Sequence, residues 1–421
     1  MQITSPLPYF ILMPLFYLLA AALSRSYWWR EHRALTNTSN FNPGMEGLRG
    51  LLAMSVFFYH AVVTYFWLKT GNWEPPPSHF YAQLGPFPVT MFFFITGFLF
   101  WTKILKSQGP LPVRAFLMNR IRRVYPVYFC AVVLTFGFVI VESQFRANVP
   151  VRMLILQAGQ WFLSGVPLGF PKINSCFMVP INGGVFWTLR IEWAFYLLLP
   201  WLKWFAKGLR LAALFAICGF VLYLNWAIPH GPTVSRAIDL VTELAFYLAC
   251  CFSFGMLAAT LKARYRLERI ACHPACTPAA LALLIGVLFI APPQYGLWES
   301  LLLAPIFVMV IYGNRFHGFL TSAPLLYLGT ISYSIYVLHG LILHFFAQLI
   351  VRRVGGGDCS AIVYWALIGI AGISVIAVSS LSYRFVELPL MTMGARGARN
   401  KPLRGSICAS SESPVIAVEA K

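Results

Sequence analysis

The stretch Glu46–Ala61, "EGLRGLLAMSVFFYHA", is apolar enough to lie in a lipid bilayer, yet it carries ionisable side chains. Arg49 stands near its start and His60 near its end, separated by eleven positions. Eleven residues make about three turns of an α-helix, so both side chains share one face, roughly 16 Å apart along the axis. Ionisable residues inside membrane helices are costly, which makes both of them candidates for function.

Apolar runs of similar length recur along the whole chain. Of its 421 residues, 59% are hydrophobic and 11% are charged, whereas about a quarter of the residues of a soluble domain are charged. A run of about 20 apolar residues is long enough to cross the hydrocarbon core of a bilayer. We therefore predict an all-α polytopic membrane protein. The predicted spans are 7–24, 47–68, 84–105, 122–141, 185–205, 208–228, 238–260, 275–291, 296–312, 326–351 and 361–385.

The distribution of positive charge predicts the orientation of these spans, because Lys and Arg accumulate in cytoplasmic loops. If the spans alternate in direction, most of the 32 Lys and Arg residues fall on one side. We therefore expect a plasma (inner) membrane protein with its N-terminus outside and its C-terminus in the cytoplasm. This placement explains the net charge of +19 without a nucleic-acid partner. The few basic residues of the outer side are Lys69, Arg146, Arg152, Lys172, Arg236, Arg352 and Arg353.

The chain is predicted to hold one membrane domain, 44–389, between two shorter segments. Residues 1–43 contain the first span and a cytoplasmic linker; that span is interpreted as an uncleaved anchor, because no Lys or Arg precedes it. Residues 390–421 are rich in Arg, Ser and Gly and are predicted to form a disordered cytoplasmic tail. The outer segment 142–184 is too polar to span and is expected in the interface or as a re-entrant segment.

The cysteine pattern does not predict a disulfide framework or a metal site. The nine cysteines are scattered, mostly in apolar runs, where Cys behaves as a small hydrophobic residue. Cys272, His273 and Cys276 could supply three metal ligands, but a closed zinc site needs a fourth. We predict no metal.

A second ionisable group enters the membrane from the opposite side, in "GVFWTLRIEWAFYLLLP". Glu192 would lie about 10 Å below the outer surface at a rise of 1.5 Å per residue. Tyr196 shares its face, four residues further on. The carboxylate could therefore meet His60 near the middle of the membrane and orient its imidazole. A purely structural ion pair is the alternative interpretation of Glu192.

An arginine pair lies at the opposite end of the predicted bundle, in "MNRIRRVYPVYF". Arg120 and Arg123 are three residues apart, so they share a helix face. The accumulation of positive charge on the cytoplasmic side explains such a pair without a function. The functional alternative is a phosphate clamp, because the guanidinium fork matches phosphate oxygens.

Six short motifs in this order resemble the acyltransferase-3 family of integral membrane acyltransferases. They are "EGLRG…FFYHA", "MFFFITGFLFW", "RIRRVYPVY", "WTLRIEWAFYLLLP", "LGTISYSIYVLHGL" and "SYRFVELP", and together they cover about residues 44–389. The resemblance implies ten helices that move an acyl group, often acetyl, from cytoplasmic acyl-CoA to a hydroxyl, commonly on an envelope sugar. It also implies roles for Arg49 and His60 of the first motif, for the pair Arg120 and Arg123, and for Glu192. The span 7–24 lies outside the resemblance.

These residues suggest a reaction path. Arg49, Arg120 and Arg123 would hold the phosphates of acyl-CoA, and the thioester would lie near His60. His60 would then act as a general base on the acceptor hydroxyl or would carry the acyl group itself. We favour the general base, because no second base for acyl-histidine formation is evident.

The remaining candidates have less defined roles. Glu192 would orient His60 or bind the acceptor, and Tyr196 and His339 are candidates for substrate binding. Packing explains His339 equally well, helix packing could explain His60, and a membrane-surface anchor could explain Arg49. The main rival function is a secondary transporter with a proton relay through His60, Glu192 and His339, although we find no pair of related halves. The acceptor, the acyl length, the role of the first span and the oligomeric state are not specified by the sequence.

Overall fold

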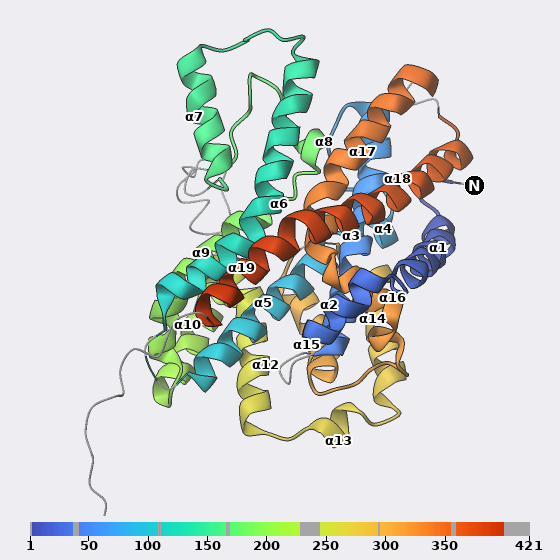
Figure 1. Cartoon of the computed structure of the whole chain (residues 1–421). Coiled ribbons are helices and arrows are strands. Elements are labelled where there is room, and N and C mark those ends of the chain that lie inside the picture. The colour runs from blue at the N-terminus through green and yellow to red at the C-terminus, as the bar shows by residue number, and fades with distance from the viewer. Residues whose placement is uncertain are drawn as a thin grey trace, which may run out of the picture.

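The computed structural model describes residues 2–36, 42–107, 109, 111–165, 169–227, 245–293, 295–354 and 359–399. Across these ranges the chain forms helices joined by short loops (Figure 1). The helices are α1 Leu7–Leu23, α2 Tyr27–Thr36, α3 Pro43–Thr70, α4 His79–Gln83, α5 Pro86–Lys106, α6 Val113–Glu142, α7 Val151–Phe162, α8 Val179–Asn182, α9 Trp187–Leu202, α10 Leu209–Ala227, α12 Ser253–Arg264, α13 Glu268–Ala271, α14 Cys276–Phe289, α15 Leu297–Ile311, α16 Ala323–Thr330, α17 Ser332–Val354, α18 Ala361–Ser382 and α19 Leu388–Arg399. Two π-helical turns, Leu248–Phe252 and Tyr383–Glu387, precede α12 and α19.

Within the described residues, six helical stretches are long and apolar enough to cross a bilayer. Shorter apolar helices accompany them, among them α1, α14 and α15. The prediction of an all-α polytopic membrane protein is thus confirmed. The six long stretches are Pro43–Thr70, His79–Lys106, Val113–Glu142, Ala245–Arg264, Ser332–Val351 and Ala361–Met393.

The structure differs from the predicted spans in several places. The span predicted at 326–351 is broken at Ile331, between α16 and α17. The span predicted to begin at 122 belongs to a longer helix that begins at Val113. Its first turns, which are rich in arginine, are helical as well. The segment 142–184 contains two helices, α7 and α8, and the helix after the last span extends to Arg399. Residues 238–244 and 400–421, which include most of the predicted disordered tail, lie outside the described residues.

The helix α3, which carries the opening motif, has well-defined ends. The side chain of Asn42 caps its first turn by accepting a hydrogen bond from the backbone N–H of Met45, at 3.2 Å, and Pro43 fits the first helical position. Gly71 ends the helix in the left-handed conformation, with φ of 77°. Buried residues occur on all faces of α3, as expected for a central helix of a bundle.

Glycines let α3 and α17 approach their neighbours closely. A Cβ atom on Gly329 of α16 would lie 2.0 Å from the carbonyl oxygen of Glu46 in α3. A Cβ atom on Gly340 of α17 would lie 2.2 Å from the backbone of Asn182, at the end of α8. Small residues at such crossings are typical of membrane helix packing. A Cβ atom on Gly183, directly after α8, would lie 3.4 Å from the Cα atom of Gly340 and 3.6 Å from the ring of His60, so α17, α3 and the turn after α8 meet there.

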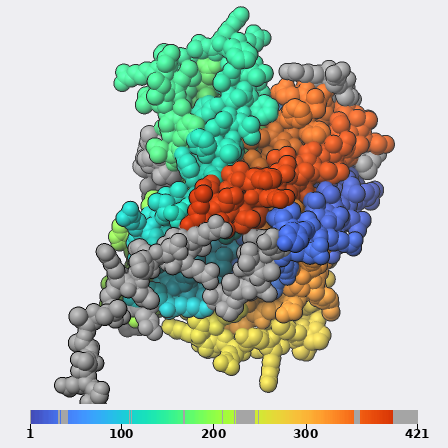
Figure 2. All heavy atoms as spheres, viewed as in Figure 1, coloured from blue at the N-terminus to red at the C-terminus, as the bar shows by residue number. Residues whose placement is uncertain are grey.

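The outer surface of the bundle is apolar along α18. This helix and α17 cross the face drawn in Figure 2, between α1 on one side and α6 with α7 on the other. Large side chains of α18 such as Ile362, Ile370 and Leu381 are exposed there. Exposed apolar side chains along a spanning helix suit contact with lipid, and all backbone polar groups of the helix are bonded internally.

Candidate functional site

Two buried histidines meet where α3 packs against α17. His60 lies on α3 with 8% of its surface exposed, and His339 lies on α17 with 0% exposed. The Nε2 atom of His339 is 3.0 Å from the Nδ1 atom of His60. Each ring also bonds the carbonyl four residues before it in its own helix: His60 Nδ1 with Val56 at 3.1 Å, and His339 Nδ1 with Ile335 at 3.0 Å.

This bonding pattern assigns the protons on the two neutral rings. The carbonyl of Ile335 can only accept, so Nδ1 of His339 carries a proton and its Nε2 accepts. The proton between the rings must then belong to Nδ1 of His60, which donates to His339 and also lies near the Val56 carbonyl. Neutral His60 therefore carries its lone pair on Nε2. Such an arrangement resembles the way a second group fixes the tautomer of a catalytic histidine.

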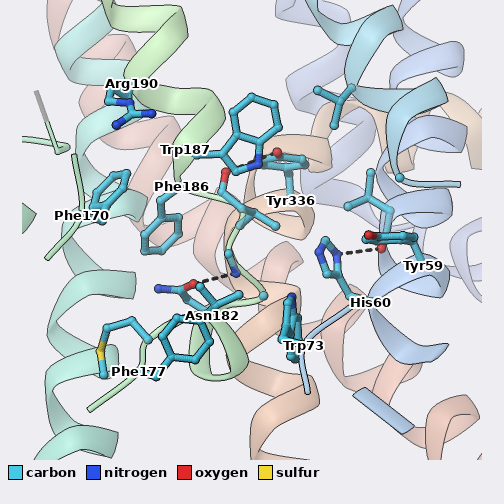
Figure 3. A pocket seen from close by; sticks show the side chains of 18 of the residues that line it. Tyr59, His60, Trp73, Phe170, Phe177, Asn182, Phe186, Trp187, Arg190 and Tyr336 are labelled. Atoms are coloured by element: carbon cyan, nitrogen blue, oxygen red, sulfur yellow. Dashed lines mark hydrogen bonds between the residues drawn. The ribbon is translucent and has the colours of Figure 1, made fainter. Parts of the chain in front are cut away.

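His60 lines a large cavity at the end of the molecule formed by α8 and the loops near α7, which we call the histidine cavity (Figure 3). Its volume is about 550 Å³. The Trp73 ring stacks on the His60 ring with centroids 6.2 Å apart, and the backbone of Gly183 lies against the Cδ2 edge of that ring. The cavity is lined by many aromatic side chains: Tyr59, Trp73, Trp161, Phe170, Phe177, Phe186, Trp187, Tyr295 and Tyr336.

The charged residues that line the histidine cavity are both cations. Lys172 and Arg190 face it, whereas none of its lining residues in the described part of the chain is acidic. Arg190 lies at one side of the cavity beside Trp187 and Phe186 (Figure 3). Asn182 accepts a hydrogen bond from the N–H of Gly184 at 2.8 Å, which holds the turn between α8 and α9. The cavity thus offers aromatic walls and a positive field.

A second cavity, which we call the arginine cavity, lies further toward the start of α3 and has a volume of about 150 Å³. It brings together the residues predicted to hold phosphates, Arg49, Arg120 and Arg123, from α3 and α6. Arg49 pairs with Glu46 at 3.2 Å. The guanidinium of Arg120 lies 5.1 Å from the centroid of the Phe100 ring.

Glu192 and Tyr196 of α9 also line the arginine cavity. The hydroxyl of Tyr196 donates to the Glu192 carboxylate and lies within reach of Arg120. Glu192 therefore contacts Tyr196 and the arginines, whereas the bonded partner of His60 is His339. The expected meeting of Glu192 with His60 does not occur, because the α9 face that bears Glu192 turns toward α6.

The two cavities share a wall. Tyr336 lines both, as does Val89, and the Tyr336 hydroxyl bonds the Thr188 hydroxyl at 2.8 Å. His339 follows Tyr336 by three residues on α17, so the tyrosine lies next to the histidine pair, with ring centroids 6.2 Å apart. The histidine pair therefore lies next to the boundary between the two cavities, with His60 lining the histidine cavity.

The sequence analysis missed several residues of the site. Trp73, Lys172, Asn182, Arg190 and Tyr336 were not candidates. Only Tyr336 could have been inferred from the sequence, because it lies one helical turn before His339 and therefore on the same face. The others lie in loops or at helix ends, whose spatial positions do not follow from hydropathy.

The fold and these cavities define a polytopic membrane protein with buried ionisable side chains at the meeting point of two cavities. The family described as "Acyltransferase domain" matches residues 42–384, and the chain belongs to this family, the acyltransferase-3 family of integral membrane acyltransferases. This confirms the resemblance found in the motifs.

Curated relatives are similar to this chain at low identity. Peptidoglycan O-acetyltransferase OatA of Listeria monocytogenes is 25% identical over 86% of this chain and 58% of its own length. O-acetyltransferase OatA of Staphylococcus aureus strain MRSA252 is 24% identical over 86% of this chain and 59% of its own length. The chain thus spans somewhat under three fifths of the length of these relatives. No solved structure matches the chain.

Proposed function

We propose that the protein is an O-acyltransferase that moves an acyl group, acetyl by similarity to its relatives, from acyl-CoA to a hydroxyl of an envelope glycan. The observation that carries this proposal is the His60–His339 pair beside Tyr336, which lines both an arginine-lined cavity and the aromatic cavity that His60 lines. Guanidinium groups suit the phosphates of a CoA thioester. Aromatic walls suit the apolar faces of sugar rings, while polar groups orient them.

His60 acts as the general base in this proposal. The acceptor hydroxyl in the histidine cavity gives its proton to Nε2 of His60 while its oxygen attacks the thioester carbonyl. The new C–O bond replaces the C–S bond, and the departing CoA thiolate takes the proton from the His60 imidazolium. His339 accepts the Nδ1 proton of His60 throughout, so it holds the reactive tautomer in place. His339 is thus a positioning residue.

The names of the relatives support peptidoglycan as one acceptor class, since that polymer is in the printed name of the Listeria protein. Lys172 and Arg190 support an acceptor that carries negative charge near its hydroxyl. The proposal includes the predicted orientation, in which the start of α3 faces the cytoplasm, where acyl-CoA is made.

The test is acetyl transfer by the purified full-length protein in lipid nanodiscs, with acetyl-CoA as donor and peptidoglycan fragments or other envelope sugars as acceptors. We expect CoA release that depends on the acceptor, and His60→Ala should lose roughly 10²–10⁴-fold in rate, the usual contribution of a general base. His79→Gln is the matched control, because His79 is exposed and lies outside both cavities.

The result also separates the two chemical routes. Direct transfer predicts no enzyme-bound acyl group after acid quenching, whereas an acyl carrier predicts a labelled adduct that disappears in His60→Ala. Transfer by folded His60→Ala at the wild-type rate would overturn the proposal. Proton-coupled solute uptake without acyl transfer would instead support a transporter.

A further inference from the structure

A third cavity, which we call the basic pocket, opens at the end of the molecule formed by α13 and the start of α3. Its volume is about 620 Å³. Its walls come from the beginning of α3, the ends of α5 and α12, and the segment after α15. Four cations line it, Lys103, Lys106, Lys262 and Arg315, against one acid, Glu268. Such a lining is suited to a ligand with several negative charges.

Backbone and side-chain contacts hold the walls of the basic pocket in place. Lys262 donates to the carbonyl of Ile311, and its Nζ atom lies 5.7 Å from the centroid of the Tyr312 ring. Asn314 donates to the carbonyl of Ala271 at 2.8 Å, which ties the segment after α15 to α13. The pocket is thus preformed around its cations.

The basic pocket adjoins the arginine cavity. Leu99 of α5 lines both, and Lys103, one turn further on, lies within electrostatic reach of Arg120 and Arg123. Together with Tyr336, which lies between the arginine cavity and the histidine cavity, these contacts place the three cavities one after another along α3.

The dimensions of this series fit an elongated ligand. Met45 lines the basic pocket and His60 the histidine cavity, and fifteen residues of helix separate them by roughly 22 Å. The arginine cavity is too small for an adenine nucleotide, at about 150 Å³, whereas the basic pocket falls within the range of roughly 300–1,000 Å³ typical of ligand sites. A ligand that reacts at His60 would therefore place a thin arm in the arginine cavity and its bulky charged end in the basic pocket.

We propose that the basic pocket binds the 3′-phosphoadenosine end of the acyl-CoA donor, with Lys262 and Arg315 contacting its phosphate. This inference rests on the proposed function and divides the donor between two sites. The arginine cavity would hold the pyrophosphate and the start of the pantetheine arm, and the basic pocket would recognise the nucleotide.

The experiment compares three donors with the full-length protein in nanodiscs: acetyl-CoA, acetyl-3′-dephospho-CoA and the short thioester S-acetyl-N-acetylcysteamine. We expect the wild type to prefer acetyl-CoA over the dephospho donor by about tenfold or more in kcat/KM, since one charge-assisted contact contributes at least about 1.4 kcal/mol. Lys262→Gln and Arg315→Gln should remove this preference without changing the rate with the short thioester, which also shows that each variant is folded.

Arg266→Gln is the control, because Arg266 is an exposed cation of the same region that does not line the pocket. Equal use of both CoA donors by the wild type would overturn the inference and leave the proposed function intact. A loss of preference in Arg266→Gln equal to that in Lys262→Gln would also overturn it, because it would show a general surface-charge effect. Failure of all three thioesters to donate would overturn the proposed function itself.

Discussion

The hydrogen bond between His339 and His60 is the smallest unit on which the proposed chemistry depends. His339→Leu removes, at similar volume, one of the two acceptors near the Nδ1 proton of His60 and leaves only the Val56 carbonyl. The loss of such a buried bond costs roughly 1–3 kcal/mol, so we expect kcat to fall about 10- to 100-fold while the KM values for donor and acceptor change little. His339→Gln, whose side-chain oxygen can accept the same proton, should keep more activity than His339→Leu. Equal kcat values for both variants and the wild type would show that His339 only fills space.

Glu192 lines the arginine cavity, which holds the donor in the proposed function. Glu192→Ala deprives Tyr196 of its hydrogen-bond acceptor and Arg120 of a nearby carboxylate. We expect an increase of about tenfold in the KM for acetyl-CoA, the effect of one charge-assisted bond. The pH dependence of kcat should match that of the wild type, since Glu192 and His60 line different cavities. A displaced pH profile with an unchanged donor KM would contradict this assignment.

For single residues, the sequence predicts which side chains share a helix better than it predicts which side chains touch across helices. The spacing of Arg49 and His60 follows from helix geometry, and the structure indeed places both on α3, each in a cavity. The partner of His60 could not be read from the sequence, because it depends on the rotation and register of α17 against α3. Hydropathy gave the depth of Glu192 but not the direction in which it faces.

Among the helices, the contact of α17 with the turn after α8 controls the position of His339. Gly340→Ala would bring a Cβ atom within 2.2 Å of the Asn182 backbone, so the two elements must separate. Overpacking of this kind costs roughly 1–3 kcal/mol, and we expect a lower unfolding temperature together with reduced acyl transfer.

The matched control is Gly137→Ala in α6, where an added Cβ atom meets nothing within 4 Å. Alanine favours a helix over glycine by roughly 0.5–1 kcal/mol, so this variant should be as stable as the wild type or slightly more stable. Thermal unfolding in detergent compares the two. Equal unfolding temperatures for Gly340→Ala and the wild type would show that the two elements can move apart without a loss of stability.

The helices were largely predictable because an apolar run of about 20 residues has few alternatives in a bilayer. The errors occur where another force competes with hydropathy. The predicted span began only at 122, after the charged Arg114 and Arg120, yet α6 begins at Val113 and includes both. The break at Ile331 carries no proline and no charge, so nothing in the local sequence marks it.

Considered as a whole, the molecule contains cavities that approach one another from opposite ends of α3 and are separated at Tyr336. Tyr336→Ala removes the ring shared by the histidine and arginine cavities. Water should then reach the thioester, so we expect release of CoA without an acceptor to rise relative to acyl transfer. Tyr336→Phe keeps the ring and should retain the wild-type ratio of hydrolysis to transfer. An unchanged ratio in Tyr336→Ala would show that another element separates the cavities.

The hydrogen bond between Tyr336 and Thr188 has a consequence for the cell as well as for the enzyme. Many cellular membranes hold a voltage and a proton gradient across the bilayer that such a protein crosses. A water-filled passage from one face to the other would let ions leak across the bilayer. The two histidines beside it could also relay protons. In the proposed reaction, a narrow aromatic partition would let a carbonyl group and a hydroxyl meet while keeping the bilayer electrically insulating.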